Sequence, residues 1–232
     1  MASNTYEAKL VEKLASMFGE SLEVSRLIFE VLRTGKSIIG FSEILALARR
    51  LMKAGNVEDF TREAVLSMYG WRILIPLESR REASLSWERK VCTFRKDEAY
   101  IIPQCITYAF EKFQAEGVWN CKYAVDKYFE RIGEPYRFKV PEIVDEMVDK
   151  AYFKLFTNGA RIREICLRKG LPGDRVGVLI VELKGGGFIS PALIPNRPVN
   201  SAEEEMFRGS PIYELNRALF VLRLKWGNKP KR

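Results

Sequence analysis

The sequence predicts an α+β fold that is mostly helical and consists of two similar halves. Three observations support this prediction. Apolar residues recur at helical spacing along most of the chain, the spacing changes to that of strands in two regions, and the order of elements repeats. The 232 residues suffice for one large domain or for two of about 100 residues each.

Four helices are expected before the first strand. Apolar stripes place them at residues 5–18, 22–33, 41–54 and 57–69, and a glycine follows each one within a few residues. Ser21 is of a type that caps helix N-termini, so the second helix is expected to begin directly after it.

The first strand region follows these helices. WRILIPL at 71–77 is rich in strand-forming residues, and AYIIPQ at 99–104 is expected to be a returning strand. The charged stretch between them contains a candidate strand at 84–91. Two further helices are expected, at 105–116 and 118–132.

A boundary is expected at GEPYRFKVPE, residues 133–142, because two prolines and a glycine interrupt the helical pattern there. Beyond it we expect a helix at 142–157, a pair of helices, strands at 188–194 and 211–216, and a last helix at 217–226.

The pair of helices lies in RIREICLRKGLPGDRVGVLIVEL, residues 161–183, and is expected to cross at a steep angle. Gly170 supplies the left-handed backbone that ends the first helix, and Leu171 fills the gap between the two. Asp174 is expected to cap the second helix. Cys166 is small at the point where the helices must approach closely.

This pair of helices, with GFIS and PIYELN as the strands of a hairpin, resembles the helix-turn-helix and wing of the winged-helix family over residues 141–226. The residues at the family's spacing are Cys166, Gly170, Leu171, Val176 and Leu179. Lys169 departs from the pattern, since an apolar residue is commoner there. Residues 22–110 resemble the family more weakly, because their inter-helix turn is longer and Arg62 falls at an apolar position.

The chain is thus similar to tandem winged-helix proteins, of which archaeal transcription factors are the nearest kind. The resemblance implies two winged-helix domains, each with three helices and a β-hairpin wing, plus an N-terminal and a connecting helix. The expected division is 1–20 for the N-terminal helix, 21–117 for the first domain, 118–140 for the connecting helix and linker, 141–226 for the second domain and 227–232 for a basic tail.

The resemblance also implies binding of double-stranded DNA, with each third helix in the major groove and each wing on the backbone or minor groove. The net charge of +8 and the pI of about 9.3 agree with a polyanionic partner. Cations that neutralise phosphates are expected around the second turn, in the first wing and on the third helices. They are Arg62, Arg80, Arg81, Arg89, Lys90, Arg161, Arg163, Arg168, Lys169, Arg175 and Lys184.

The expected function is therefore that of a transcription regulator, although the third helices offer few side chains for reading bases. Two alternatives stay open. Apolar faces on the third helices favour a non-catalytic protein-interaction module in a transcription or replication assembly. An enzyme that uses Glu142, Asp145, Glu146 and Asp149 is the weaker alternative, because their spacing is also that of an ordinary solvated helix face.

Composition argues against catalysis, cofactors and metals. Histidine is absent, which removes the commonest general base and the imidazole ligand. The four cysteines include no Cys-x-x-Cys pair, so a zinc site is not expected. Cys105, Cys121 and Cys166 are expected to be buried free thiols, and a disulfide stays open for a hyperthermophilic source.

The N-terminal residues carry charges where a signal peptide has an apolar core, and no apolar run approaches the roughly 20 residues of a membrane span. We therefore expect a cytoplasmic protein without a membrane partner, either a monomer or a homodimer. Its high content of Lys, Arg and Glu is compatible with an archaeal thermophile.

Overall fold

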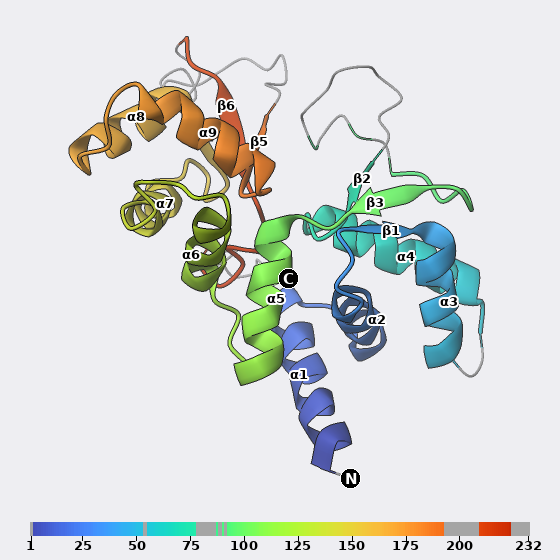
Figure 1. Cartoon of the computed structure of the whole chain (residues 1–232). Helices are drawn as coiled ribbons and strands as arrows, with labels where there is room; N and C mark the ends of the chain where they lie inside the picture. Colours follow the sequence, from blue (N-terminus) through green and yellow to red (C-terminus); the bar gives the residue numbers. More distant parts are fainter. Residues whose placement is uncertain are drawn as a thin grey trace, which may run out of the picture.

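The computed structural model of the chain is α+β and mostly helical, as predicted (Figure 1). Side chains are described from residue 5 onward, and the described residues are 2–52, 55–77, 87, 90, 92–192 and 209–223.

The first half runs from the N-terminus to the long central helix. Its elements are α1 (Ala2–Phe18), α2 (Leu22–Arg33), β1 (Ile38–Gly40), α3 (Phe41–Leu51), α4 (Val57–Gly70), β2 (Ile75–Pro76), β3 (Ala99–Ile101) and α5 (Gln104–Glu116). The predicted cap of α2 is confirmed, because the Ser21 hydroxyl accepts a hydrogen bond from the backbone N–H of Val24.

The second half contains the remaining elements. They are α6 (Cys121–Arg131), α7 (Val140–Asp149), β4 (Phe156–Asn158), α8 (Gly159–Arg168), α9 (Arg175–Gly185), β5 (Ile189–Pro191) and β6 (Ile212–Leu215). Among the described helices, none combines the length and apolar composition that a bilayer crossing requires.

Each half has a three-stranded antiparallel sheet, and the order of elements is the same in both. A helix leads to a short edge strand, two helices follow, and two further strands complete the sheet. The strand orders are β1-β3-β2 and β4-β6-β5, so the last strand is central in each sheet. The sequence does not predict β1 and β4, because three residues are too few to show a strand period.

The predicted strands are longer than the observed ones. The strand expected at 71–77 is confirmed only at β2, because residues 73 and 74 donate hydrogen bonds to the Met68 carbonyl at the end of α4. The strand expected at 99–104 ends at Ile101, and α5 begins at Gln104. The candidate strand at 84–91 lies outside the described residues except for Trp87 and Lys90.

The helix predicted at 142–157 is wrong in its second part. α7 ends at Asp149, and Phe153 and Lys154 then adopt left-handed φ angles of 49° and 57°. A helix cannot continue through such a backbone. The chain turns instead and pairs Tyr152 with Phe156, which opens β4.

The helix predicted at 217–226 is also wrong in its described part. Residues 217–223 form turns. The backbone N–H of Ala218 donates to the Trp71 carbonyl, and that of Leu219 donates to the side chain of Asn216. The first of these hydrogen bonds is tertiary and ties the segment to the other half, and the second is local to the turn.

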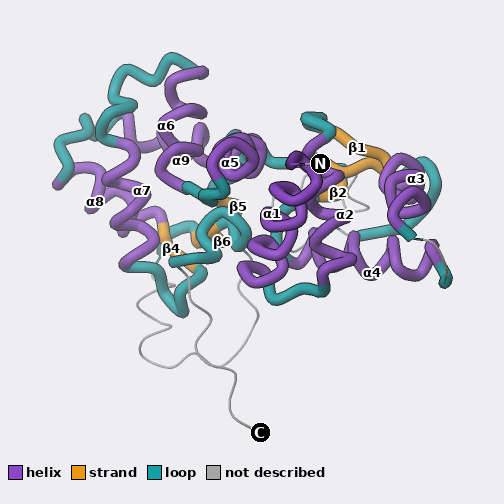
Figure 2. The backbone as a smooth tube through the Cα atoms, turned by 90° about the horizontal axis from the view of Figure 1, so that it is seen from below, coloured by secondary structure: helices purple, strands orange, loops and turns teal. Residues whose placement is uncertain are grey.

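One continuous apolar core extends through both halves. α5 lies between them in Figures 1 and 2, with α6 to α9 on one side and α2 to α4 on the other. Four rings, from Phe18, Trp71, Phe113 and Trp119, meet near the base of α5 at centroid distances of 5.2 to 5.9 Å. The predicted domain boundaries stay a prediction, since this core crosses them.

The four cysteines are free thiols. Cys105 and Cys166 are buried, as predicted, whereas Cys121 is only half-buried, and the same holds for Cys92.

The turn between α8 and α9 confirms the predicted roles of Gly170 and Leu171. Gly170 has a φ of 75°, and its N–H donates to the Leu167 carbonyl. Leu171 is buried, and its N–H donates to the Cys166 carbonyl at 2.9 Å. This pattern satisfies the last carbonyls of α8. The predicted cap at Asp174 is wrong, because this residue has helical φ and ψ and its side chain makes no capping hydrogen bond.

The glycine run 185–187 lets α9 approach its neighbours closely. A Cβ at Gly186 would lie 2.5 Å from the ring of Phe188 and 2.9 Å from that of Tyr128. One at Gly187 would lie 2.5 Å from Pro103, and this glycine also has a φ of 76°. The run therefore ends the helix and brings β5 against α5 and α6.

Gly170→Ala is expected to lower the free energy of unfolding by about 1–2 kcal/mol, because a left-handed φ strains any residue with a Cβ. Gly177 is the matched control, since it lies within α9 with no atom near its missing Cβ. Gly177→Ala is expected to raise the free energy of unfolding by about 0.5–1 kcal/mol. Urea unfolding measures both. If Gly170→Ala left the free energy of unfolding unchanged, that result would contradict the assigned turn.

Candidate nucleic-acid interface

The third helix of each predicted unit, α4 or α9, exposes a different kind of face. α9 buries Val176, Leu179 and Leu183. Its outward side carries Val178 and Val181, of which Val181 is 61% exposed. This face is apolar and gives no hydrogen bond to a base edge.

The exposed face of α4 is largely acidic. Glu58, Asp59 and Glu63 are exposed there together with Leu66. Arg62, the predicted phosphate contact, forms ion pairs with Glu58 at 2.6 Å and Asp59 at 3.6 Å. α4 alone therefore carries a net negative charge, which repels a phosphate.

The structure does not bring the predicted cations of the second unit into one cluster. Three of them point toward α7 or the segment after it. Arg168 is paired with Glu146, and Lys169 is paired with Glu142 at 3.1 Å. Arg161 donates to the Lys150 carbonyl at 2.6 Å, and its guanidinium lies 3.8 Å from the centroid of the Tyr152 ring.

Two other cations flank α9. Arg163 is exposed, and its guanidinium reaches the turn at Gly173 just before the helix begins. Lys184 lies in the last turn of the helix and is half-buried. Within the described part of the chain, neither one has a carboxylate within 4.0 Å, so both are free to meet an external anion.

Arg175, at the start of α9, is held by two acids, of which one is buried. It pairs with Glu134 at 2.5 Å and approaches Glu182 at 4.0 Å, and the Glu134 side chain is only 3% exposed. Removing one partner of such a pair leaves a buried charge uncompensated. The phosphate contact expected of Arg175 stays a prediction, and a phosphate would have to compete with Glu134 for this guanidinium.

The predicted cations of the first hairpin are mostly outside the described residues. These are Arg80, Arg81 and Arg89. Lys90 is described, and its ammonium donates to the Pro76 carbonyl at 2.8 Å. Burial lowers the pKa of Lys90. It therefore ties the connection between the two strands to the end of β2.

Ion-pair energies decide which cations remain available. Exposed pairs contribute only about 0–1 kcal/mol, so a phosphate can replace the carboxylate partner of Arg62, Arg168 or Lys169. Arg175 is different, because its partner Glu134 has lost its contact with water.

The four acids of α7 are all paired. Glu142 pairs with Lys169, Glu146 with Arg168 and Lys150, and both Asp145 and Asp149 with Arg223. Hydrogen bonds from Arg168 and Lys150 lower the pKa of Glu146 to about 2. No group of three or more His, Cys, Asp or Glu side chains suited to a metal occurs among the described residues.

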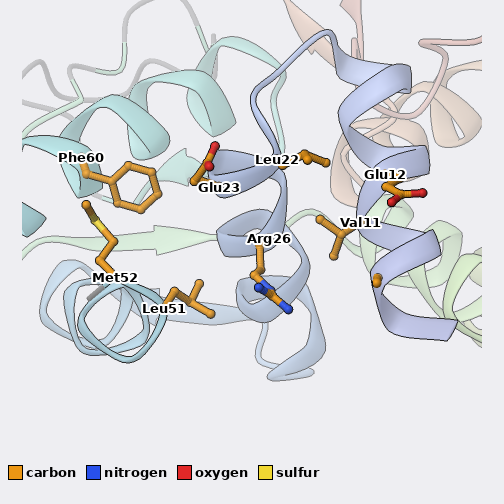
Figure 3. A pocket seen from close by; sticks show the side chains of 9 residues that line it. Val11, Glu12, Leu22, Glu23, Arg26, Leu51, Met52 and Phe60 are labelled. Carbon is orange, nitrogen blue, oxygen red and sulfur yellow. The ribbon is translucent and has the colours of Figure 1, made fainter. Parts of the chain in front are cut away.

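A pocket of about 300 Å³ lies between α1, α2, the end of α3 and the start of α4 (Figure 3). Val11, Leu22, Leu51, Met52 and Phe60 supply most of its lining. The charged ends of the remaining labelled side chains, from Glu12, Glu23 and Arg26, point in different directions. Converging polar groups, which orient ligands in binding sites, are therefore not part of this lining.

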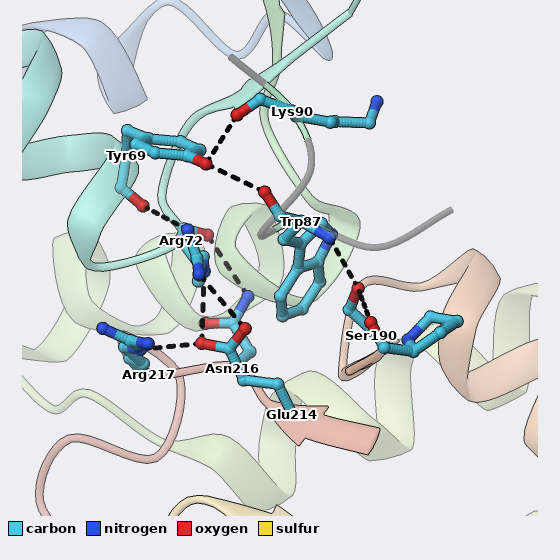
Figure 4. Close-up of polar contacts among 9 residues, drawn as sticks. Tyr69, Arg72, Trp87, Lys90, Ser190, Glu214, Asn216 and Arg217 are labelled. Atoms are coloured by element: carbon cyan, nitrogen blue, oxygen red, sulfur yellow. Dashed lines mark hydrogen bonds and ion pairs between the residues drawn. The ribbon is translucent and has the colours of Figure 1, made fainter. Parts of the chain in front are cut away.

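The sequence does not reveal a buried polar cluster that joins the two halves (Figure 4). We call Arg72, Glu214, Asn216 and Arg217 the inter-unit clamp. Arg72 donates to both carboxylate oxygens of Glu214, at 3.2 and 3.1 Å. Arg217 donates to the same carboxylate at 2.7 Å, and the Asn216 amide donates to the Arg72 and Gly187 carbonyls.

The clamp connects the ends of the two hairpins. The Glu214 side chain is 1% exposed, and Arg72 adopts a φ of 64° to reach it. Beside the clamp, the backbone N–H of Trp87 donates to the Ser190 hydroxyl at 3.0 Å, and the Tyr69 hydroxyl donates to the Trp87 carbonyl. The hairpins β2–β3 and β5–β6 are thus fixed relative to each other.

Residues 25–226 match the model of one protein family, and the chain belongs to that family, whose function is uncharacterised. No curated protein and no solved structure matches the chain. The family match spans both sheets and the inter-unit clamp. The two halves therefore occur together as parts of one family unit.

Proposed function

We propose that the chain is a non-catalytic tandem winged-helix protein that binds double-stranded DNA and regulates transcription. The observation that carries this proposal is the repeated topology. Each half has three helices followed by a two-stranded hairpin, and in the second half α8 and α9 meet at the tight turn of Gly170 and Leu171. This is the arrangement that the winged-helix resemblance implies.

Phosphate contacts provide the affinity in this proposal. Arg163 and Lys184 flank α9 without carboxylate partners in the described part of the chain, and the exposed pairs of Arg168 and Lys169 can exchange their carboxylates for phosphates. The outward face of α9 is apolar, so we expect binding that depends more on backbone phosphates than on base sequence.

Binding to a duplex should weaken steeply with salt. We expect the logarithm of the binding constant to fall linearly with the logarithm of the salt concentration, with a slope of about −0.9 for each phosphate contact. Arg163→Gln should make that slope shallower by about 1. Fluorescence anisotropy across a salt series measures both.

Arg33→Gln is the matched control, because Arg33 is an exposed arginine of α2 that is paired with Glu7 and Glu30. It should leave the slope unchanged. A chain that forms no complex with duplex at low salt, or shows a slope near zero, would refute DNA binding.

A protein-interaction module is the second candidate. The apolar outward face of α9, which Leu167 of α8 extends toward the turn, and the acidic face of α4 favour it. The same salt series distinguishes the two candidates. Binding to the duplex with a steep salt dependence favours DNA binding, and absence of duplex binding favours the protein-interaction module.

A further inference from the structure

A small charged cluster holds α9 against the end of α6. Glu134 follows Gly133, the glycine that ends α6, and Arg175 and Glu182 belong to the first and third turns of α9. Arg175 donates to Glu134 at 2.5 Å, and the backbone N–H of Tyr136 donates to the other oxygen of Glu134 at 3.0 Å. We call Glu134, Arg175 and Glu182 the α9 anchor.

The α9 anchor has two acids and one cation, so it is unbalanced when both acids are ionised. One carboxylate oxygen of Glu182 and the Nε of Arg175 are buried and have no hydrogen-bond partner among the described residues. A buried polar atom without a partner is costly. Both carboxylates lie within 4.0 Å of the same Arg175 nitrogen, so a proton on Glu182 lets this acid donate to its neighbour and lowers the cost at the carboxyl group. The Arg175 Nε still has no partner in the described part of the chain.

We propose that the α9 anchor is a proton-sensitive device, in which a proton on Glu182 fastens α9 to the end of α6 and its loss loosens the helix. This inference concerns the packing of α9 alone and does not depend on DNA binding.

Few other charged groups face Glu182. The Glu134 carboxylate approaches from the α6–α7 connection and Arg175 from α9 itself. Tyr128 approaches from α6, where its hydroxyl donates to the backbone carbonyl of Glu182 at 3.0 Å. Burial raises the pKa of Tyr128, so this phenol stays neutral and does not compete for the proton.

The direction of the pH effect follows from the surroundings of Glu182. Burial, together with the neighbouring Glu134 carboxylate, raises the pKa of Glu182 to about 7, whereas Arg175 lowers it. A carboxyl group with a raised pKa in the folded state stabilises that state fully below its ordinary pKa of about 4.3. This stabilisation is lost as the pH rises toward 7.

Hydrogen exchange of the α9 amides tests the inference. After correction for the intrinsic pH dependence of exchange, we expect protection of α9 in the unmodified chain to fall about tenfold between pH 5 and pH 8. Glu182→Gln should remove this decline, because glutamine stays neutral at every pH. Glu134→Gln should make the decline smaller, since Glu182 stays partly buried but then has only Arg175 as a charged neighbour.

Glu142→Gln is the matched control, because Glu142 is an exposed acid of α7 that is paired with Lys169. It should keep the decline of the unmodified chain. An equal decline in Glu182→Gln overturns the inference. So does constant α9 protection in the unmodified chain, a result that needs no variant to fold.

Discussion

Glu214→Ala is expected to lower the free energy of unfolding by about 3–5 kcal/mol, because it removes one partner of a buried ion pair. The Glu214 carboxylate accepts hydrogen bonds from Arg72 and Arg217. Without it, Arg72 keeps a charge that is 6% exposed and has no carboxylate to balance it. Urea unfolding followed by circular dichroism gives the value.

Glu130→Ala serves as the control for this experiment. Glu130 also accepts from two cations, Lys127 and Arg137, but its side chain is 50% exposed. Water replaces the lost contacts there, so we expect a change within about 1 kcal/mol. The clamp would have no stabilising role if Glu214→Ala cost no more than Glu130→Ala.

Phe188→Ala is expected to lower the free energy of unfolding by about 3–5 kcal/mol, because it removes a fully buried ring and leaves a cavity. The ring of Phe188 packs against Tyr128 and Phe129 of α6, at centroid distances of 5.3 and 5.9 Å. The residues around it belong to different elements and cannot collapse into the space without moving α6 or β5.

The matched control is Phe138→Ala. This phenylalanine is 79% exposed, and its main contact is the guanidinium of Arg137 at 4.6 Å from the ring centroid. We expect its replacement to change the free energy of unfolding by no more than about 0.5 kcal/mol. Equal losses for the two variants would show that Phe188 is not part of the core.

Local sequence patterns predict the elements whose cause is local. The helices follow from apolar stripes and terminal glycines, and the turn of Gly170 and Leu171 follows from backbone conformation and the size of one side chain. The strands β1 and β4 are not predicted, because each is defined as a strand only by its pairing with another strand more than 50 residues away.

Long-range contacts explain the wrong predictions as well. RALFVLRLKW has a helical pattern, yet Ala218 donates its N–H to Trp71 in the other half of the chain. The acidic partners of two predicted phosphate contacts also come from other elements. Sequence spacing shows where Arg168 and Arg175 lie, but not that Glu146 and Glu134 reach them from other elements.

The inter-unit clamp has a consequence for how the chain is made. Arg72 and Glu214 are 142 residues apart, and the Trp71 carbonyl and the Trp119 indole both find their hydrogen-bond partners at Ala218. During synthesis the first half is made well before residues 214–218, so these groups are at first without their partners. The final packing of the first half therefore waits until the second hairpin has been made, and until then these polar groups lack their native partners.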